Sequence, residues 1–400
     1  MEAVERFLCL ASREKGHDFL RQCAAAGVRV TLLTLDKNRD AAWPREVLED
    51  LTTMPSGLNR EQILNTVSWM ARGRRFDRVV ALDENDLETA AQIREHMRVP
   101  GMGTTTAGCY RDKLAQRVIA SAFGYKVPQF CRVLNYDELR DYVARVPAPW
   151  VLRPRMSTLV AASRIIYDSE QLWRALEHLG DAQSHYILEQ TLSGDLFYVD
   201  AIVSECEVKF SAVLQGGERP SPPEQMDEVF TTRTVDRVSR DARRLTAINH
   251  ELAPSLGMVR GVTHAEFLRS RADGSYYFVE IGAGVGGAFL DQVVETATGV
   301  NLWREWAKLE IGDMRHTAYA APDSFEGYAG SVVCDAQGPW PDLDSISDPS
   351  IVSRIRKDRH AGLIVSAASP ERVQRLLDDY RVQFEGCLLT PEGLDRVPGD

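Results

Sequence analysis

Two glutamates are the residues whose spacing most directly indicates chemistry. The segment RADGS (271–275) is a strong turn between two apolar stretches, which predicts a hairpin over 261–284. If this hairpin is symmetric about Asp273, Glu266 and Glu280 lie directly opposite each other, with Cβ atoms roughly 5 Å apart. The two carboxylates would repel each other, and a divalent cation such as Mg²⁺ would remove that repulsion. The alternative is two exposed glutamates on a water-facing ribbon, and a one-residue slip would separate them.

The glycine-rich segment GAGVGG (282–287) supports a competing interpretation. It contains GxGxxG after a predicted strand, and VEIGAG (279–284) is similar to the first motif of many methyltransferases. That interpretation requires a helix and then a second strand ending in an acid about 20 residues later. The sequence at 293–311 is instead largely helical in pattern. A methyltransferase-like protein is therefore the third-ranked hypothesis.

The elements that must position these residues begin with alternating strands and helices. Strand-like runs at 6–12 and 28–35 flank a helical pattern at 15–27, and 75–97 repeats the plan. Such alternation predicts parallel βαβ units. The Gly- and Thr-rich segment 99–108 marks a domain boundary.

Composition restricts the class of protein. The chain has 400 residues, 44% hydrophobic and 26% charged, which is typical of a globular protein of two or three domains. Its net charge of −11 argues against general nucleic-acid binding. No apolar run approaches the roughly 18 residues of a membrane span, and no signal-peptide pattern occurs at the N-terminus. We therefore expect a cytoplasmic protein without membrane contact.

Five motifs, taken in order, resemble those of the ATP-grasp superfamily: RDK (111–113), WVLRPR (150–155), ILEQTLSGD (187–195), THAEF (263–267) and FVEIGAGVGG (278–287). The resemblance covers most of the chain. It implies a fold with α/β and α+β parts, namely an ATP-grasp fold preceded by a Rossmann-like βαβ domain. The implied domains are a pre-ATP-grasp domain at 1–105, an ATP-grasp domain at 106–312 with a lid subdomain at about 125–195, and a small C-terminal α+β segment at 313–400.

The resemblance also implies an activity. ATP-grasp ligases phosphorylate a carboxylate with ATP and let a nucleophile displace phosphate from the acyl phosphate. We therefore expect an ATP- and Mg²⁺-dependent ligase that joins a small carboxylate to an amino acid or other small amine. The expected partners are these small molecules. Homodimers are common in the family, so a homodimer is the oligomer to consider.

The same resemblance assigns roles to individual residues. Lys113 and Arg153 match phosphate-binding positions, and Glu266 and Glu280 match Mg²⁺ ligands. His264 shares a strand face with Glu266 and could contact phosphate or substrate, with a structural histidine as the alternative. The remaining cofactor-binding positions fall on Glu189, Gln190 and Leu192 at the adenine hinge, on Asp195 beside the ribose-binding position, and on Ser157 in the phosphate loop.

Three departures from the family pattern put catalysis in question. The loop 156–163 contains no glycine, although this loop is usually glycine-rich. Gly282 and Gly284 stand where a third metal ligand and a catalytic arginine are expected. Another cation could substitute, and Arg155, Arg164 and Arg260 are the candidates. The alternative is a catalytically weakened protein that acts as a nucleotide-binding partner or regulator.

Overall fold

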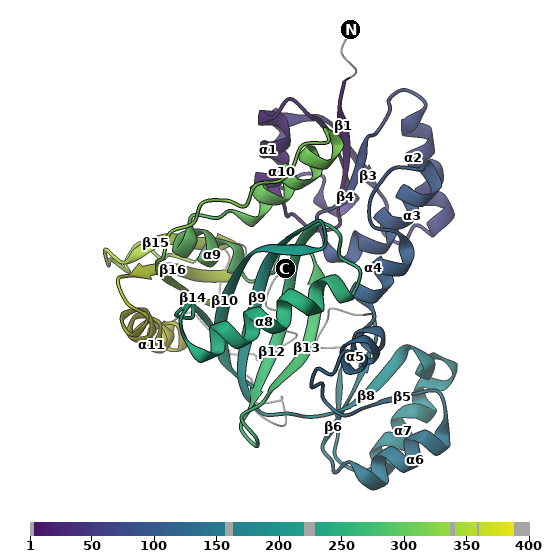
Figure 1. The fold of residues 1–400 in the computed structure, drawn as a ribbon, viewed down its shortest axis with the longest axis vertical. Helices are drawn as coiled ribbons and strands as arrows, with labels where there is room; N and C mark the ends of the chain where they lie inside the picture. Colours follow the sequence, from purple (N-terminus) through teal and green to yellow (C-terminus); the bar gives the residue numbers. More distant parts are fainter. Residues whose placement is uncertain (1–3, 157–162, 220–228, 337–340, 358–359, 388–400) are drawn as a thin grey trace.

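The chain builds three β-sheets that meet around its centre (Figure 1). The computed structural model describes residues 4–156, 163–219, 229–336, 341–357 and 360–387. Within these residues the sheets contain four, eight and four strands.

The first sheet is parallel, with the strand order β3-β2-β1-β4. Its elements are β1 (Arg6–Ala11), α1 (His17–Ala25), β2 (Arg29–Leu35), β3 (Leu48–Met54), α2 (Arg60–Ala71), β4 (Arg78–Ala81) and α3 (Leu87–Met97). The predicted strand–helix alternation is confirmed, whereas β3 and α2 were not anticipated. The carboxyl ends of parallel strands share one edge, so the segment 82–86 after β4 lies beside the residues that follow β1.

A small antiparallel sheet forms a separate lobe in the lower part of Figure 1. Its strand order is β5-β8-β6-β7, and two helices of the same segment pack on it. The elements are β5 (Phe130–Arg132), α6 (Tyr136–Arg145), β6 (Trp150–Pro154), β7 (Arg164–Ile166), α7 (Ser169–Leu179) and β8 (Tyr186–Gln190). Two helices lead to this lobe, α4 (Thr104–Arg111) and α5 (Lys113–Ala122), and the Asp112 side chain caps α5.

The large sheet has the order β13-β12-β9-β10-β11-β14-β16-β15 and is antiparallel throughout. Its strands are β9 (Gly194–Ser204), β10 (Glu207–Arg219), β11 (Val229–Thr234), β12 (Gly261–Ser270), β13 (Tyr276–Ala283), β14 (Tyr328–Asp335), β15 (Ile351–Lys357) and β16 (His360–Ala367). The helices are α8 (Arg240–Ser255), α9 (Leu290–Thr298), α10 (Leu302–Met314) and α11 (Pro370–Cys387). The strands of the C-terminal segment therefore extend the sheet that β9–β13 begin.

Side chains alternate between the two faces of this sheet. On β9, Phe197 and Val199 belong to the core beneath α8, whereas Leu196 and Tyr198 belong to the core that contains α9 and α10. On β12, Ala265 belongs to the core beneath α8, whereas Leu268 belongs to the core that contains α9 and α10. We call the second face the α10 face, and it carries the candidate site.

The methyltransferase hypothesis is wrong. β13 pairs antiparallel with β12, and the glycine-rich segment after it leads into α9 and α10 rather than into a second parallel strand. A dinucleotide-type glycine turn needs a parallel βαβ setting, which GAGVGG does not have here.

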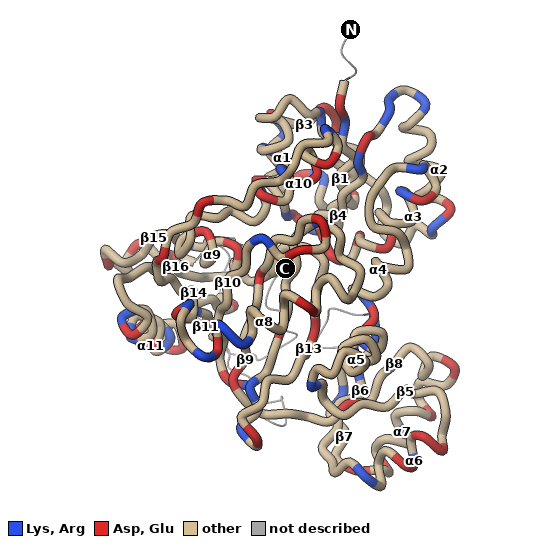
Figure 2. The backbone as a smooth tube through the Cα atoms, in the orientation of Figure 1, with Lys and Arg blue, Asp and Glu red and all other residues tan. Residues whose placement is uncertain are grey.

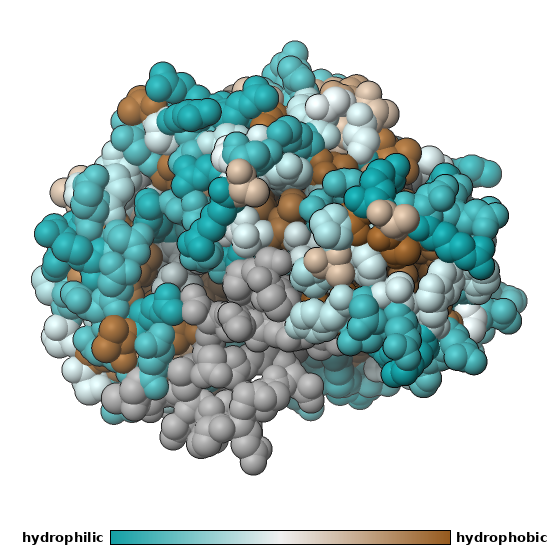
Figure 3. Space-filling model, turned by 90° about the horizontal axis from the view of Figure 1, so that it is seen from below, coloured by the Kyte–Doolittle hydropathy of each residue, from teal (hydrophilic) through white to brown (hydrophobic). Residues whose placement is uncertain are grey.

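Charged residues of both signs are interspersed along the described part of the chain (Figure 2). Seen from below, the rim of the molecule is mainly hydrophilic, and apolar surface gathers towards the middle of that face (Figure 3). None of the helices in the described part of the chain has both the length and the hydropathy of a membrane-spanning segment.

Candidate active site

The register of the β12–β13 hairpin confirms the predicted pairing of Glu266 with Glu280. The hairpin is nevertheless not symmetric about Asp273 along its whole length, because Phe267 pairs with Phe278. The offset leaves Val279 as an extra residue, so β13 contains a β-bulge. Phe278 consequently faces α8, while Glu280 turns to the α10 face beside Glu266. The bulge is thus what brings both carboxylates to one face.

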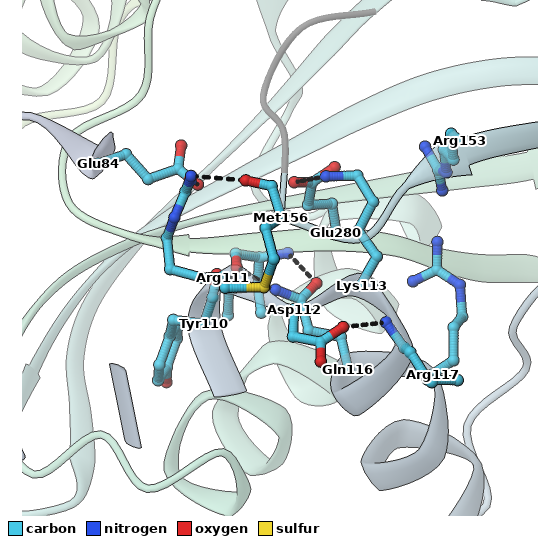
Figure 4. A network of polar contacts seen from close by, with 12 residues as sticks. Glu84, Tyr110, Arg111, Asp112, Lys113, Gln116, Arg117, Arg153, Met156 and Glu280 are labelled. Atoms are coloured by element: carbon cyan, nitrogen blue, oxygen red, sulfur yellow. Dashed lines mark hydrogen bonds and ion pairs between the residues drawn. The ribbon is translucent and has the colours of Figure 1, made fainter. Parts of the chain in front are cut away.

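Cations lie close to the paired carboxylates, and Figure 4 shows Lys113 and Arg153 beside Glu280. Lys113 at the start of α5 donates from Nζ to Glu280 Oε1 over 2.7 Å. Burial opposes ionisation of Glu280, but the charges of Lys113 and Arg153 outweigh it and lower the pKa of that carboxyl. Burial and the neighbouring Glu280 instead raise the pKa of Glu266. Such a pair gains from any further positive charge placed between its oxygens.

Glu189 lies inside the protein between two arginines. Its side chain is 1% exposed, and Arg117 Nε donates to its Oε1 over 2.5 Å. Arg153 forms an ion pair with its other oxygen. Burial raises the pKa of Glu189, but the two arginines outweigh it and lower the pKa to about 2. The Glu189 carboxylate therefore positions Arg153, and Arg153 in turn acts on Glu280 and Glu266.

Arg219 is a cation near the site that the motif comparison missed. It ends β10, and a register shift between Gln215 and Glu218 turns it to the face of Glu266. Burial lowers the pKa of the Arg219 guanidinium, and so does the charge of Arg153, while Glu266 acts in the opposite direction. The only sequence signal was its place at the end of a long strand.

His264 is held by a buried carboxylate. Its Nδ1 lies 2.8 Å from Asp200 Oδ1, and its ring stacks on Tyr198 with centroids 5.4 Å apart. Burial lowers the pKa of His264, but the charge of Asp200 outweighs it and raises the pKa to about 8. A Cβ at Gly286 would lie 2.6 Å from His264 Nδ1, so the glycine makes room for the ring.

Glu84 is the second residue that sequence reasoning missed. It follows β4 of the parallel sheet, and its Oε1 accepts a hydrogen bond of 2.5 Å from Arg111 Nη1. A Cβ at Gly282 would lie 3.7 Å from the Glu84 carboxyl carbon. Arg111 also donates to the carbonyl oxygen of Met156, where the phosphate loop begins (Figure 4). A carboxylate from a distant element thus lies where the family pattern expects a third ligand.

Several predicted residues lie elsewhere. Asp195 faces α8, where Arg269 Nη2 donates to it over 2.5 Å, so it lies on the opposite face of the sheet from Glu266. Arg155 is held by Asp112 at the start of α5. Arg260 forms an ion pair with Asp313.

The remaining predicted positions border the site. Arg164 is exposed at the start of β7. Gln190 ends β8, where its backbone N–H donates to Gln129, and Leu192 packs against the large core in the link to β9. Both lie in the connection between the small and the large sheet. Ser157 lies outside the described residues.

The donor set fits a magnesium ion that is shared with a phosphate ligand. Among the described residues, no group of three or more His, Cys, Asp or Glu side chains is arranged to hold a metal. Glu266 and Glu280 supply two hard carboxylates, and burial together with the charge of Glu280 raises the pKa of Glu266. Mg²⁺ commonly takes one or two carboxylates and completes its shell with water and phosphate oxygens. Two carboxylates therefore suffice for this type of site.

Comparisons with known proteins show the fold. No protein-family model matches the chain. The crystal structure of an L-amino acid ligase from Bacillus licheniformis matches 97% of this chain and 99% of its own, with a TM-score of 0.75 and 17% identity. A 2-oxoglutarate carboxylase biotin carboxylase domain from Hydrogenobacter thermophilus, in complex with MgADP, ADP and bicarbonate, matches 92% of this chain and 88% of its own, with a TM-score of 0.67 and 16% identity.

A sequence relative points in the same direction. An L-arginine-specific L-amino acid ligase of Bacillus subtilis is 19% identical over 244 residues, 59% of this chain and 58% of that protein. The chain spans less than three fifths of the length of the curated relatives it matches. The chain has the ATP-grasp fold, as its motif order predicted.

Proposed function

We propose that this chain is an ATP- and Mg²⁺-dependent carboxylate ligase that forms an amide with an amino acid or small amine through an acyl phosphate. The observation that carries this proposal is the pairing of Glu266 with Glu280 beneath Lys113 and Arg153 in an ATP-grasp fold. The likeness to L-amino acid ligases supports it. This chemistry needs aligned reactants and neutralised phosphate charge more than covalent help from the protein.

The carboxylates and the cations of the site would bind different parts of Mg·ATP. Glu266 and Glu280 would hold Mg²⁺, which when bound neutralises phosphate oxygens. Lys113 and Arg153 would bind the phosphate groups, and Glu189 keeps Arg153 in place. Arg219 would supply the positive charge that Gly284 cannot. Preorganised charges of this kind need no rearrangement when charge develops on the transferred group.

Two further carboxylates lie near the site, each beside a cationic group. Glu84 lies beside Gly282 and accepts a hydrogen bond from Arg111, and Asp200 is fully buried behind His264. Because both carboxylates are already compensated, neither by itself selects the charge of the substrate. His264 has Nδ1 engaged by Asp200, which leaves Nε2 to hydrogen-bond an oxygen of substrate or phosphate. Because Gly286 has no side chain, it would leave room for the His264 ring to keep that orientation.

The substitution Glu280→Ala tests the metal assignment. We expect it to abolish ADP release in an assay with Mg·ATP and amino-acid mixtures, while the circular dichroism spectrum stays like that of the wild type. Glu61→Ala, at an exposed position in the first turn of α2, is the matched control and should leave ADP release unchanged. Wild-type ADP release from Glu280→Ala would refute the assignment.

A second candidate function rests on Gly284, which cannot supply the expected guanidinium. A catalytically weakened protein would bind nucleotide as a partner or regulator without efficient ligation. It predicts thermal stabilisation by Mg·ATP but no substrate-dependent ADP release across a broad panel of carboxylates and amines. ADP release that depends on Arg219 would instead favour the ligase.

A further inference from the structure

A cavity of about 690 Å³ lies on the face of the large sheet opposite the candidate active site. Its floor is formed by Phe267 and Phe278, which point away from Glu266 and Glu280. Three walls enclose it: the first turns of α8, the β12–β13 turn, and the segment Gly124–Lys126 after α5. In Figure 1, α8 crosses the sheet in front of β12 and lies near α5. The cavity is thus separated from the paired glutamates by the sheet itself.

Three arginines on α8 line this cavity. Arg240, Arg243 and Arg244 are spaced i, i+3 and i+4, so they lie on one face of the helix. All three are exposed, and no described residue forms an ion pair or hydrogen bond with their guanidinium groups. Like charges at this spacing repel one another and destabilise the helix. The cluster therefore carries uncompensated positive charge.

The acidic residues around the cavity are already engaged. Asp241 accepts hydrogen bonds from Arg269, and Asp273 forms an ion pair with Lys126 over 2.9 Å. Glu251 accepts a hydrogen bond from Tyr125 over 2.5 Å. None of these carboxylates neutralises the arginines, so an anion from outside the chain would be attracted to them in a protein of net charge −11.

We propose that this cavity is a binding site for a small molecule carrying two or more phosphate groups, separate from the catalytic site. Arginines bind phosphate through paired N–H donors, and three of them on one helix face can engage two adjacent groups. Arg240 is also the first residue of a 16-residue helix, whose N-terminal dipole favours anions. The volume matches the range of small-molecule sites, roughly 300–1,000 Å³. The half-buried rings of Tyr125 and Tyr276 form an apolar side for the rest of the ligand.

The experiment is titration calorimetry of the full chain with inorganic tripolyphosphate and with ADP, both without Mg²⁺. The test variant is Arg240→Gln/Arg243→Gln/Arg244→Gln. The matched control is Arg72→Gln/Arg372→Gln/Arg375→Gln, which removes the same charge from exposed positions just after α2 and on α11. Because the substituted arginines are exposed, all variants should fold, which circular dichroism checks. Any binding at the catalytic site is common to all three proteins, so their difference isolates the cavity.

We expect the wild type and the control to share a binding event that the test variant loses or weakens at least about 10-fold. The same event should weaken as the salt concentration rises. Tighter binding of ADP than of tripolyphosphate would assign a nucleotide-like ligand, and the reverse a simple polyphosphate. The proposal is overturned if the wild type binds neither tripolyphosphate nor ADP, if the test variant binds like the wild type, or if the control loses the same event.

Discussion

The substitution Glu189→Gln tests how much stability the buried carboxylate beside the site contributes. Glu189 is buried between Arg117 and Arg153, and the pKa of its carboxyl is lowered from 4.5 to about 2. A shift of that size corresponds to about 3 kcal/mol of stability at neutral pH. Removing one partner of a buried ion pair typically costs about 3–5 kcal/mol. We therefore expect Glu189→Gln to lose about 3–5 kcal/mol of unfolding free energy at pH 7.

The lowered pKa of Glu189 also predicts how the stability difference changes with pH. A lowered pKa in the folded state means that stability is present above the unfolded value near 4.5 and is lost as pH falls towards 2. The deficit of Glu189→Gln relative to the wild type should therefore shrink by about 1–1.5 kcal/mol between pH 7 and pH 3.5. Urea denaturation followed by tryptophan fluorescence at both pH values measures it, because Trp150 lies on β6, the strand next to Glu189.

The control is Glu138→Gln on α6 of the same lobe, where an exposed ion pair with Arg132 should contribute less than about 1 kcal/mol. The reasoning is refuted if Glu189→Gln lies within 1 kcal/mol of the wild type at pH 7. It also fails if the deficit is the same at pH 3.5, since the charge of Glu189 would then carry no stability.

Two further substitutions test backbone packing and a buried acid. Gly194→Ala should destabilise the protein by about 1–3 kcal/mol or more in urea denaturation, because its Cβ would lie 2.0 Å from the carbonyl oxygen of Arg269. The Gly73→Ala control, with nothing within 4 Å, should be near neutral, and equal stability of the two variants would contradict the packing. Burial raises the pKa of Asp86 to about 6 despite its hydrogen bonds from Ser12. The folded state therefore binds this proton more tightly than the unfolded state does. As a result, the wild type loses stability as pH rises from 4 to 6. Asp86→Asn should remove about 2–3 kcal/mol of that loss, and an unfolding difference from the wild type that stays constant between pH 4 and 7 would count against it.

Local sequence determined the hairpin and the two candidate carboxylates. The turn at RADGS and strand periodicity predicted Glu266 opposite Glu280, although the register that pairs them also needs the bulge at Val279, and Asp112 caps α5 ahead of Lys113. Motif order predicted the fold that the structural comparisons show. These features depend on residues close together in the chain, which is why a single sequence can reveal them.

Only the tertiary structure decided which charges share the site. The bulge at Val279 and the register shift before Arg219 each add one residue to a strand, and one residue moves a side chain to the other face. Glu84 comes from the parallel sheet, nearly 200 residues from Gly282. Asp195 lies on the face opposite Glu266 because side chains alternate strictly between the two faces along β9. Bulges and long-range partners leave little local signal, because they are set by how whole sheets pack.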